Sequence, residues 1–132
     1  MPLPPPLSLR RGKAVTLSRD GGETWGPLTF QPQLRGPVCQ ASLATTAAAG
    51  AAGAVLFSGP NSTAERASLV VRKSVDGGAT WDHALSIDPG PAGYSCLVAP
   101  LAQGCGDAAA CGGVLYEAEG LVIRFARFPL GF

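Results

Sequence analysis

Charged side chains are scarce in this sequence, and it holds a single histidine, which restricts the functions open to it. The 132 residues include ten Lys and Arg against nine Asp and Glu, a formal net charge of +1. Nucleic-acid binding requires a strongly basic surface, and an acidic tail requires a run of negative charges. The sequence has too few charges for either feature. A zinc site needs closely spaced cysteines or histidine partners, and His83 lies far along the chain from Cys105 and Cys111. We therefore expect no nucleic-acid partner, no metal and no cofactor.

A long apolar run is also missing. The longest, residues 46–57, is rich in small side chains, interrupted by glycine, and shorter than the roughly 20 residues that span a bilayer. The opening Met1-Pro2-Leu3-Pro4-Pro5-Pro6 has too many prolines and too few apolar residues for a signal peptide. We expect no transmembrane segment, and the sequence leaves the cellular compartment open.

Glycine and proline, by contrast, are abundant, with 18 and 12 residues respectively. They favour many short elements joined by turns over long helices, and no helix is predicted. The small-residue tract 45–53 is interpreted as a loop or as a strand with a slack connection. Short apolar runs at regular spacing predict strands at 13–17, 39–43, 54–57, 68–73, 94–99, 113–116 and 121–128.

One octapeptide pattern, Ser-x-Asp-x-Gly-x-Thr-Trp, occurs twice, at residues 18–25 and 74–81. The serines are 56 positions apart, a spacing that suits one four-stranded propeller blade per repeat. Asp-Gly-Gly supplies positive-φ positions and a side-chain oxygen for nearby amides, so the pattern predicts a hairpin turn rather than a catalytic acid. We call each octapeptide an Asp-box; its structural residues are Ser18, Asp20, Gly22 and Trp25 in the first, and Ser74, Asp76, Gly78 and Trp81 in the second.

Strands and turns together predict an all-β fold, about two blades of a β-propeller plus a strand or so of another. Two blades cannot close a ring, because each blade buries its faces only against its neighbours. Open strand edges therefore favour self-association through partial rings, or aggregation. Residues 13–132 are assigned to the partial propeller, and residues 1–12 to a separate proline-rich N-terminal segment.

The four cysteines leave one structural question open. Cys105 and Cys111 flank a five-residue loop. Such a pair forms a local disulfide in an oxidising compartment and stays reduced in a reducing one. The sequence alone does not decide between the two states.

Asp-boxes occur in unrelated propellers and therefore say little about function. Six stretches around them are more specific. They are residues 38–43 (VCQASL), 56–60 (LFSGP), 66–72 (RASLVVR), 92–97 (AGYSCL), 114–117 (VLYE) and 123–128 (IRFARF). Their order and spacing resemble the last third of exo-α-sialidases (neuraminidases), over nearly the whole chain after its proline-rich start. The resemblance implies a six-bladed sialidase-type β-propeller and a glycoside hydrolase that releases terminal sialic acid from glycoproteins, glycolipids or oligosaccharides.

The resemblance also implies a chemistry suited to a sugar that bears its own carboxylate. In the family, three arginines bind this carboxylate through bidentate, charge-assisted bonds. A tyrosine, activated by a glutamate, attacks the anomeric carbon, and a separate aspartate acts as acid/base. A phenol approaches the anionic substrate in the neutral form, whereas a carboxylate nucleophile would be repelled.

Three residues match family positions on this basis. Tyr94, in Tyr-Ser-Cys-Leu, matches the nucleophile; the alternative is an ordinary strand tyrosine with a hydrogen-bonded hydroxyl. Arg66, eight positions before the second Asp-box, matches the third arginine of the triad; the alternative is a solvated loop cation. Glu117, in Leu-Tyr-Glu, matches a glutamate that holds one triad arginine; the alternative is a surface carboxylate. Tyr94 and Glu117 are thus assigned to catalysis, and Arg66 to the substrate carboxylate.

The second arginine of the triad has a less regular match. Arg10, in Leu-Ser-Leu-Arg, is the candidate for it, although it lies closer to the first Asp-box than the corresponding arginine of the family does. Arg11 is nearly as good a candidate. Lys13 stands where the family often has a further basic residue, but lysine does not replace arginine in a bidentate role.

Other parts of the family's site have no counterpart in the sequence. No segment matches the motif of the first arginine, the acid/base aspartate or the glutamate partner of the tyrosine. We therefore expect a sialidase fragment with negligible turnover by itself. The alternative is a non-catalytic Asp-box module that binds glycans or proteins, and a purely structural repeat ranks last. The sequence leaves the preferred linkage and aglycone open.

Overall fold

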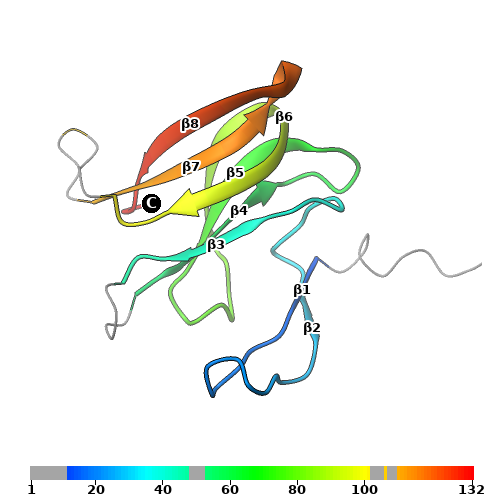
Figure 1. Cartoon of the computed structure of the whole chain (residues 1–132), viewed down its shortest axis with the longest axis vertical. Coiled ribbons are helices and arrows are strands. Elements are labelled where there is room, and N and C mark those ends of the chain that lie inside the picture. Colours follow the sequence, from blue (N-terminus) through cyan, green and yellow to red (C-terminus); the bar gives the residue numbers. More distant parts are fainter. Residues whose placement is uncertain (1–11, 48–52, 102–105, 107–109) are drawn as a thin grey trace, which may run out of the picture.

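The computed structural model describes residues 12–47, 53–101, 106 and 110–132, which form strands joined by turns and loops (Figure 1). The only helical element among these residues is one short 3-10 turn, and none could cross a membrane as a helix. In chain order the elements are β1 (Lys13–Val15), β2 (Thr29–Gln31), β3 (Ser42–Thr45), β4 (Val55–Pro60), β5 (Ala67–Ser74), β6 (His83–Val98), β7 (Cys111–Ala118), η2 (Glu119–Leu121) and β8 (Val122–Pro129).

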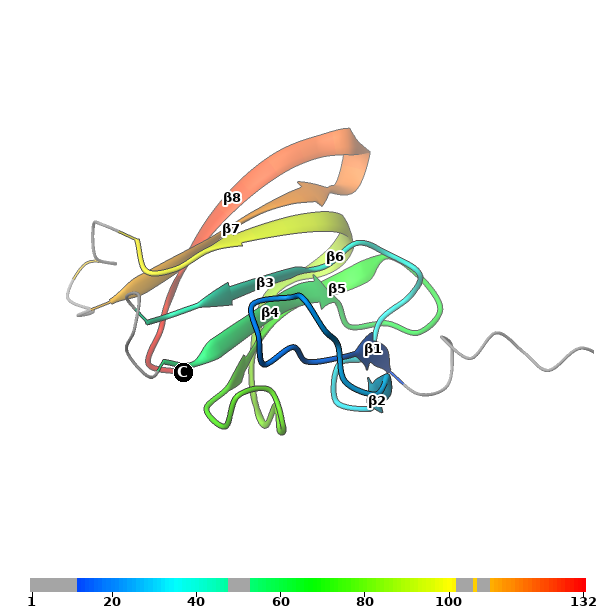
Figure 2. The ribbon, with the colours of Figure 1, turned by 60° about the horizontal axis from the view of Figure 1, so that its bottom comes forward.

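Six strands form one antiparallel sheet, in chain order from β3 to β8, while β1 and β2 form a separate hairpin. The long strand β6 serves two parts of this sheet, because β5 pairs with its residues 83–91 and β7 with its residues 92–98. Figure 2 shows the sheet curling between β5 and β7, with the β1–β2 hairpin beside it. The chain thus contains one four-stranded unit, three strands of a second and a hairpin of a third. This arrangement agrees with the predicted partial propeller.

Apart from small shifts at other strand ends, the observed strands differ from the predicted ones in three places. β2 is not predicted, because a three-residue strand with the sequence TFQ contains no apolar run. The strand predicted at 39–43 begins only at Ser42. The strand predicted at 94–99 is the second half of β6, since the turn-like Pro89-Gly90-Pro91 lies inside that strand where it changes partner. Proline is tolerated there because irregular positions in a sheet need no ladder N–H.

The main core lies between the two halves of the curled sheet. Side chains alternate between the faces of a strand, so residues two apart share a face. Leu69 and Val71 of β5 are completely buried in this way, and so are Leu56 of β4 and Val114 of β7. Both halves of the sheet therefore depend on one core, whose buried members are Leu56, Leu69, Val71, Ala92, Leu97, Val114, Tyr116, Ala118 and Phe128.

A second core lies on the opposite face of β4 and joins the sheet to the segment after the β1–β2 hairpin. Leu34, Phe57 and Trp81 are all buried there. The rings of Phe57 and Trp81 meet edge to face, with centroids 6.2 Å apart. Gln33 adds polar bonds, donating to the Asp82 carboxylate at 2.6 Å and accepting the Trp81 amide at 2.9 Å. The hairpin is thereby tied to the second Asp-box.

Both Asp-boxes make the same hydrogen bonds within their turns. In the second box the Ser74 hydroxyl donates to Asp76 at 2.7 Å and accepts the Gly78 amide at 2.8 Å. Gly78 adopts φ +94°, a conformation that favours glycine. Hydrogen bonds from Thr80, chiefly from its hydroxyl, lower the pKa of Asp76 to about 2. Equivalent bonds are present in the first box (Ser18, Asp20, Gly22 and Thr24), where they also lower the pKa of Asp20.

The tryptophans of the two boxes differ in their surroundings. Trp81 is 4% exposed and donates its indole N–H to the Gly78 carbonyl at 3.1 Å, whereas Trp25 is 62% exposed. The turn itself forms in both cases, so its local hydrogen bonds do not depend on burial of the indole. The predicted structural role of the boxes is consistent with this geometry.

Leu56→Ala should lower the free energy of unfolding by about 2–5 kcal/mol, because it leaves a cavity between the halves of the sheet. The control is Leu121→Ala, since Leu121 is 96% exposed and its truncation should change stability by less than about 0.5 kcal/mol. Chemical denaturation measures both variants. Equal losses would show that the core does not lie where described.

Asp76 should also make the stability of the fold depend on pH in the acidic range. Its pKa lies near 2 in the folded chain and near 3.9 in an unfolded one, so its ionised form favours folding above about pH 4. This contribution is lost as the pH falls from about 4 to about 2. The melting temperature of Asp76→Asn should therefore vary less over this range than that of the unmodified chain. Glu119→Gln, at an exposed carboxylate, is the control and should retain the full dependence.

Candidate active site

Three of the residues singled out by the sequence meet at one end of the sheet. Arg66 immediately precedes β5, Tyr94 follows the point where β6 changes partner, and Glu117 lies near the end of β7. The main chain brings these points together: the Ala92 amide donates to the Arg66 carbonyl at 2.9 Å, and Ala92 pairs with Ala118. Residues far apart in sequence are thereby held together by β5, β6 and β7, at the start of β5, within β6 and near the end of β7.

Arg66 and Tyr94 are in direct contact. The guanidinium carbon of Arg66 lies 5.1 Å from the centroid of the Tyr94 ring, within the range of a cation–π interaction. One guanidinium nitrogen donates to the Val38 carbonyl at 3.3 Å. Arginine carries five N–H donors in a fixed fork, so most of them stay available to an anionic ligand. Tyr94 is 47% exposed, which leaves its ring accessible beside that cation.

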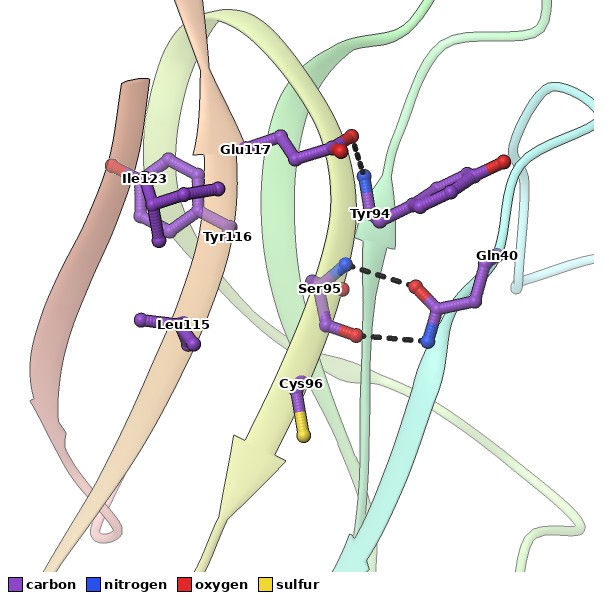
Figure 3. A pocket seen from close by; sticks show the side chains of 8 residues that line it. All are labelled: Gln40, Tyr94, Ser95, Cys96, Leu115, Tyr116, Glu117 and Ile123. Carbon is purple, nitrogen blue, oxygen red and sulfur yellow. Dashed lines mark hydrogen bonds between the residues drawn. The ribbon is translucent and has the colours of Figure 1, made fainter. Parts of the chain in front are cut away.

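Glu117 holds the backbone of Tyr94. Its carboxylate accepts the Tyr94 amide at 3.0 Å (Figure 3). Gly93 makes this approach possible, since a Cβ atom at that position would lie 2.4 Å from the same carboxylate oxygen. The predicted contact of Glu117 with an arginine is not seen: among the described residues, Glu117 forms no ion pair. Its role toward an arginine stays a prediction.

Tyr94 is also held from the opposite edge of β6, by residues to which the sequence assigns no role. The Gln40 side chain accepts the Ser95 amide and donates to the Ser95 carbonyl, both at 3.0 Å (Figure 3). The buried hydroxyls of Ser95 and Ser58 lie 2.8 Å apart. Ser42 accepts the Leu97 amide at 3.0 Å. These residues lie in stretches that resemble the family, but the sequence does not reveal their contacts, because Gln40 and Ser95 are separated by 55 positions.

Lys13 and Arg66 secure the segment that leads to Gln40. The Lys13 ammonium donates to the carbonyls of Pro37 and Cys39, at 3.0 and 3.1 Å, while Arg66 binds the carbonyl of Val38. Burial lowers the pKa of Lys13. Two cations thus bind three consecutive carbonyl groups, and the Lys13 charge is directed to the main chain.

A hollow of about 360 Å³ opens beside these residues. Gln40, Tyr94 and Glu117 border it on the polar side, and Leu115 and Ile123 form an apolar wall (Figure 3). In the part of the chain that the structure describes, no group of three His, Cys, Asp or Glu residues is arranged to hold a metal ion. The Tyr94 phenol and the Glu117 carboxylate line the hollow, and the Arg66 guanidinium lies against the Tyr94 ring.

Some sequence predictions fall outside the described residues. Arg10, Arg11 and Cys105 are among them, so the position of a second arginine stays a prediction, and the question of the Cys105–Cys111 pair that the sequence left open also falls there. Cys39 and Cys96 are free thiols, and burial raises the pKa of Cys39.

Curated proteins similar to this chain are sialidases. No protein-family model matches it. A sialidase of Micromonospora viridifaciens is 37% identical over 131 residues, which cover 95% of this chain and 19% of that protein. A sialidase of Bacteroides fragilis (strain YCH46) is 37% identical over 92 residues, which cover 64% of this chain and 17% of that protein. The chain thus spans about a fifth of the length of these relatives.

Solved structures give the same result for the fold. A Hadza microbial sialidase matches 91% of this chain and 23% of its own, with a TM-score of 0.67 and 32% identity. The leech intramolecular trans-sialidase, solved with 2,7-anhydro-Neu5Ac, matches 92% of this chain and 21% of its own, with a TM-score of 0.67 and 21% identity. Fold and site together define a part of a sialidase-type β-propeller, as predicted. The chain belongs to the sialidase family.

Gly93→Ala should displace the Glu117 carboxylate from the Tyr94 amide, because the added methyl group would occupy the oxygen's position. The Tyr94 amide should then exchange its hydrogen faster, and stability should fall by about 1 kcal/mol, the value of one hydrogen bond. Exchange measured by NMR tests this. Gly131→Ala is the control, since an added Cβ there meets no atom within 4 Å. Unchanged Tyr94 exchange in Gly93→Ala would contradict the described contact.

Proposed function

We propose that this chain carries the tyrosine-nucleophile half of an exo-α-sialidase site, which releases terminal sialic acid from glycoproteins, glycolipids or oligosaccharides. The observation that supports this most strongly is that Tyr94 contacts both Arg66 and Glu117, beside a hollow that Tyr94 and Glu117 line. These are the residues to which the family resemblance assigns substrate binding and catalysis. The curated sialidases to which the chain is similar support the same activity.

In the proposed reaction, Arg66 binds the substrate carboxylate through its free guanidinium donors. The Tyr94 oxygen then attacks the anomeric carbon and passes its proton to the activating glutamate, while the bond to the aglycone breaks and the acid/base aspartate protonates the departing oxygen. The resulting glycosyl–tyrosine intermediate is hydrolysed by water with overall retention of configuration. Glu117 acts on Tyr94 by fixing its amide, so that the phenol approaches from a defined direction.

Other groups are needed to complete this reaction. Arg10 is proposed as a second ligand of the substrate carboxylate, and residues 13–132 as the blade sequence. The acid/base aspartate and the glutamate that activates Tyr94 would come from other blades. We therefore expect negligible turnover by this chain alone. Its open strand edges are proposed to pair with further blades or with another copy of the chain.

The test is a segment exchange, in which this chain replaces the matching segment of the Micromonospora viridifaciens sialidase. The folded chimera should hydrolyse a fluorogenic sialoside, and a fluorinated sialic acid with a good leaving group should label the peptide that contains Tyr94. Tyr94→Phe should abolish the label and lower kcat on the order of 100-fold or more, because no covalent intermediate forms. Kinetics and peptide mass spectrometry measure both effects.

Tyr116→Phe is the matched control. Tyr116 lines the same hollow, is buried and donates its hydroxyl to Asp88 at 2.9 Å, so this variant loses one structural bond and leaves the Tyr94 hydroxyl in place. It should retain the label on Tyr94 and most of kcat. A folded chimera that binds sialic acid without cleaving the sialoside would instead favour the non-catalytic glycan-binding module.

A further inference from the structure

We infer that Gln40 is a positioning residue for Tyr94, whose side-chain amide fixes the main chain of β6 directly after the tyrosine. This inference deepens the proposed function, and its catalytic consequence rests on that function. Gln40 is not assigned to substrate binding here. It acts through the backbone of Ser95, with which it makes two hydrogen bonds of 3.0 Å.

The edge of β6 explains why such a residue is needed. In an antiparallel sheet, the N–H and C=O groups of successive residues point to opposite edges of a strand. β7 occupies one edge of the second half of β6. The Ser95 and Leu97 amides point to the other edge, where they meet the side chains of Gln40 and Ser42 rather than a strand backbone. Without these side chains, that edge would carry unpaired groups.

Gln40 is chemically suited to this edge. Ser95 presents one donor and one acceptor, and a carboxamide offers the complementary acceptor and donor. The same Gln40 nitrogen also donates to the Ala41 carbonyl at 3.0 Å, which fixes the amide orientation. A glutamate would accept the Ser95 N–H but place a negative oxygen against the Ser95 carbonyl. An alanine would leave both groups without a partner.

The contacts around Gln40 close into a ring that contains the proposed catalytic residues. Gln40 binds Ser95, Ser95 follows Tyr94, the Tyr94 ring stacks on Arg66, and Arg66 binds the Val38 carbonyl, two residues before Gln40. The Tyr94 amide is held by Glu117 on the β7 side. The two peptide units on either side of Tyr94 are therefore held from opposite edges of β6, the Gly93–Tyr94 unit by Glu117 and the Tyr94–Ser95 unit by Gln40. Removal of Gln40 releases one of these two edges and opens the ring.

Release of this edge should matter for chemistry more than for folding. Gln40 is exposed and belongs to neither core, so its loss leaves both cores intact. A displacement of about 1 Å in a reacting group can cost about 100-fold in rate. We therefore expect Gln40→Ala to lower kcat with little change in KM.

The chain offers a matched control in Gln33. Its side chain also pairs with backbone and carboxylate groups, namely the Trp81 amide and Asp82. It does so beside the second Asp-box, at the opposite end of β5 from Arg66. Gln33→Ala therefore removes a comparable amide clamp without contacting the Tyr94 segment.

The experiment compares Gln40→Ala and Gln33→Ala by NMR on the whole chain. In Gln40→Ala the Ser95 amide should exchange about 3- to 10-fold faster, the factor expected for a lost hydrogen bond. The Arg66 side-chain signals should lose the ring-current shift caused by Tyr94. Both signals should stay unchanged in Gln33→Ala, even if this variant melts at a lower temperature. In Gln40→Glu the Ser95 amide should keep more of its protection than in Gln40→Ala.

The sialidase chimera supplies the functional readout. Gln40→Ala should lower its kcat by about 10- to 100-fold, and Gln33→Ala should not. Unchanged Ser95 and Arg66 signals in Gln40→Ala, equal shifts in both variants, or an unchanged kcat would each overturn the inference. If the NMR signals respond as expected but the unmodified chimera is folded and inactive, the proposed function fails while the positioning of Tyr94 by Gln40 stands.

Discussion

In this chain a single strand, β6, is hydrogen-bonded to β5 along its first half and to β7 along its second. A strand that changes partners must turn, and the irregular register between Ala92 and Ser95 is where it does so. The turn directs β7 and β8 back over the face of β4 and β5. The main core fills the space between them, with Leu69 and Val71 on one side and Val114 on the other. The curled shape of the sheet and its principal core therefore share one cause.

The same turn accounts for the polar character of the site. Where a strand changes partner, its ladder of backbone hydrogen bonds is interrupted, and the groups left over need other partners. The Tyr94 amide finds one in the Glu117 carboxylate, and Ser95 finds one in the Gln40 amide. Side chains thus provide here the hydrogen bonds that a neighbouring strand provides elsewhere in the sheet. This gives a tyrosine that is half exposed in its ring and fixed in its backbone.

The parts of the fold that could be predicted from sequence are those with local causes. The Asp-box turns follow from Asp-Gly-Gly and its neighbours, and apolar runs such as residues 68–73 mark buried strands. β2 was beyond this reasoning, because three residues carry no periodicity. The continuity of β6 was also hidden, since Pro89-Gly90-Pro91 has the composition of a turn but lies within a strand. Its placement depends on pairing with β5, and no local pattern reveals that pairing.

In the site, too, residues marked by a sequence pattern could be predicted and residues defined by long-range contacts could not. Arg66, Tyr94 and Glu117 could be named because a family pattern marks their types and spacing. Gln40 and Ser58 could not, because their partner Ser95 is 55 and 37 positions away and glutamine and serine are ordinary surface residues.

The residues that stabilise the fold and the residues that position Tyr94 lie in different places. The core residues hold the sheet through buried area, which depends on shape and tolerates no loss of volume. The residues around Tyr94 lie at strand ends and hold it through directional hydrogen bonds, which add little to global stability. A change at Gln40 can therefore disturb the reacting group while the fold persists, whereas a change at Leu56 disturbs the fold first. Stability and site geometry are thus carried by different residues of the same sheet, and the turn of β6 is common to both.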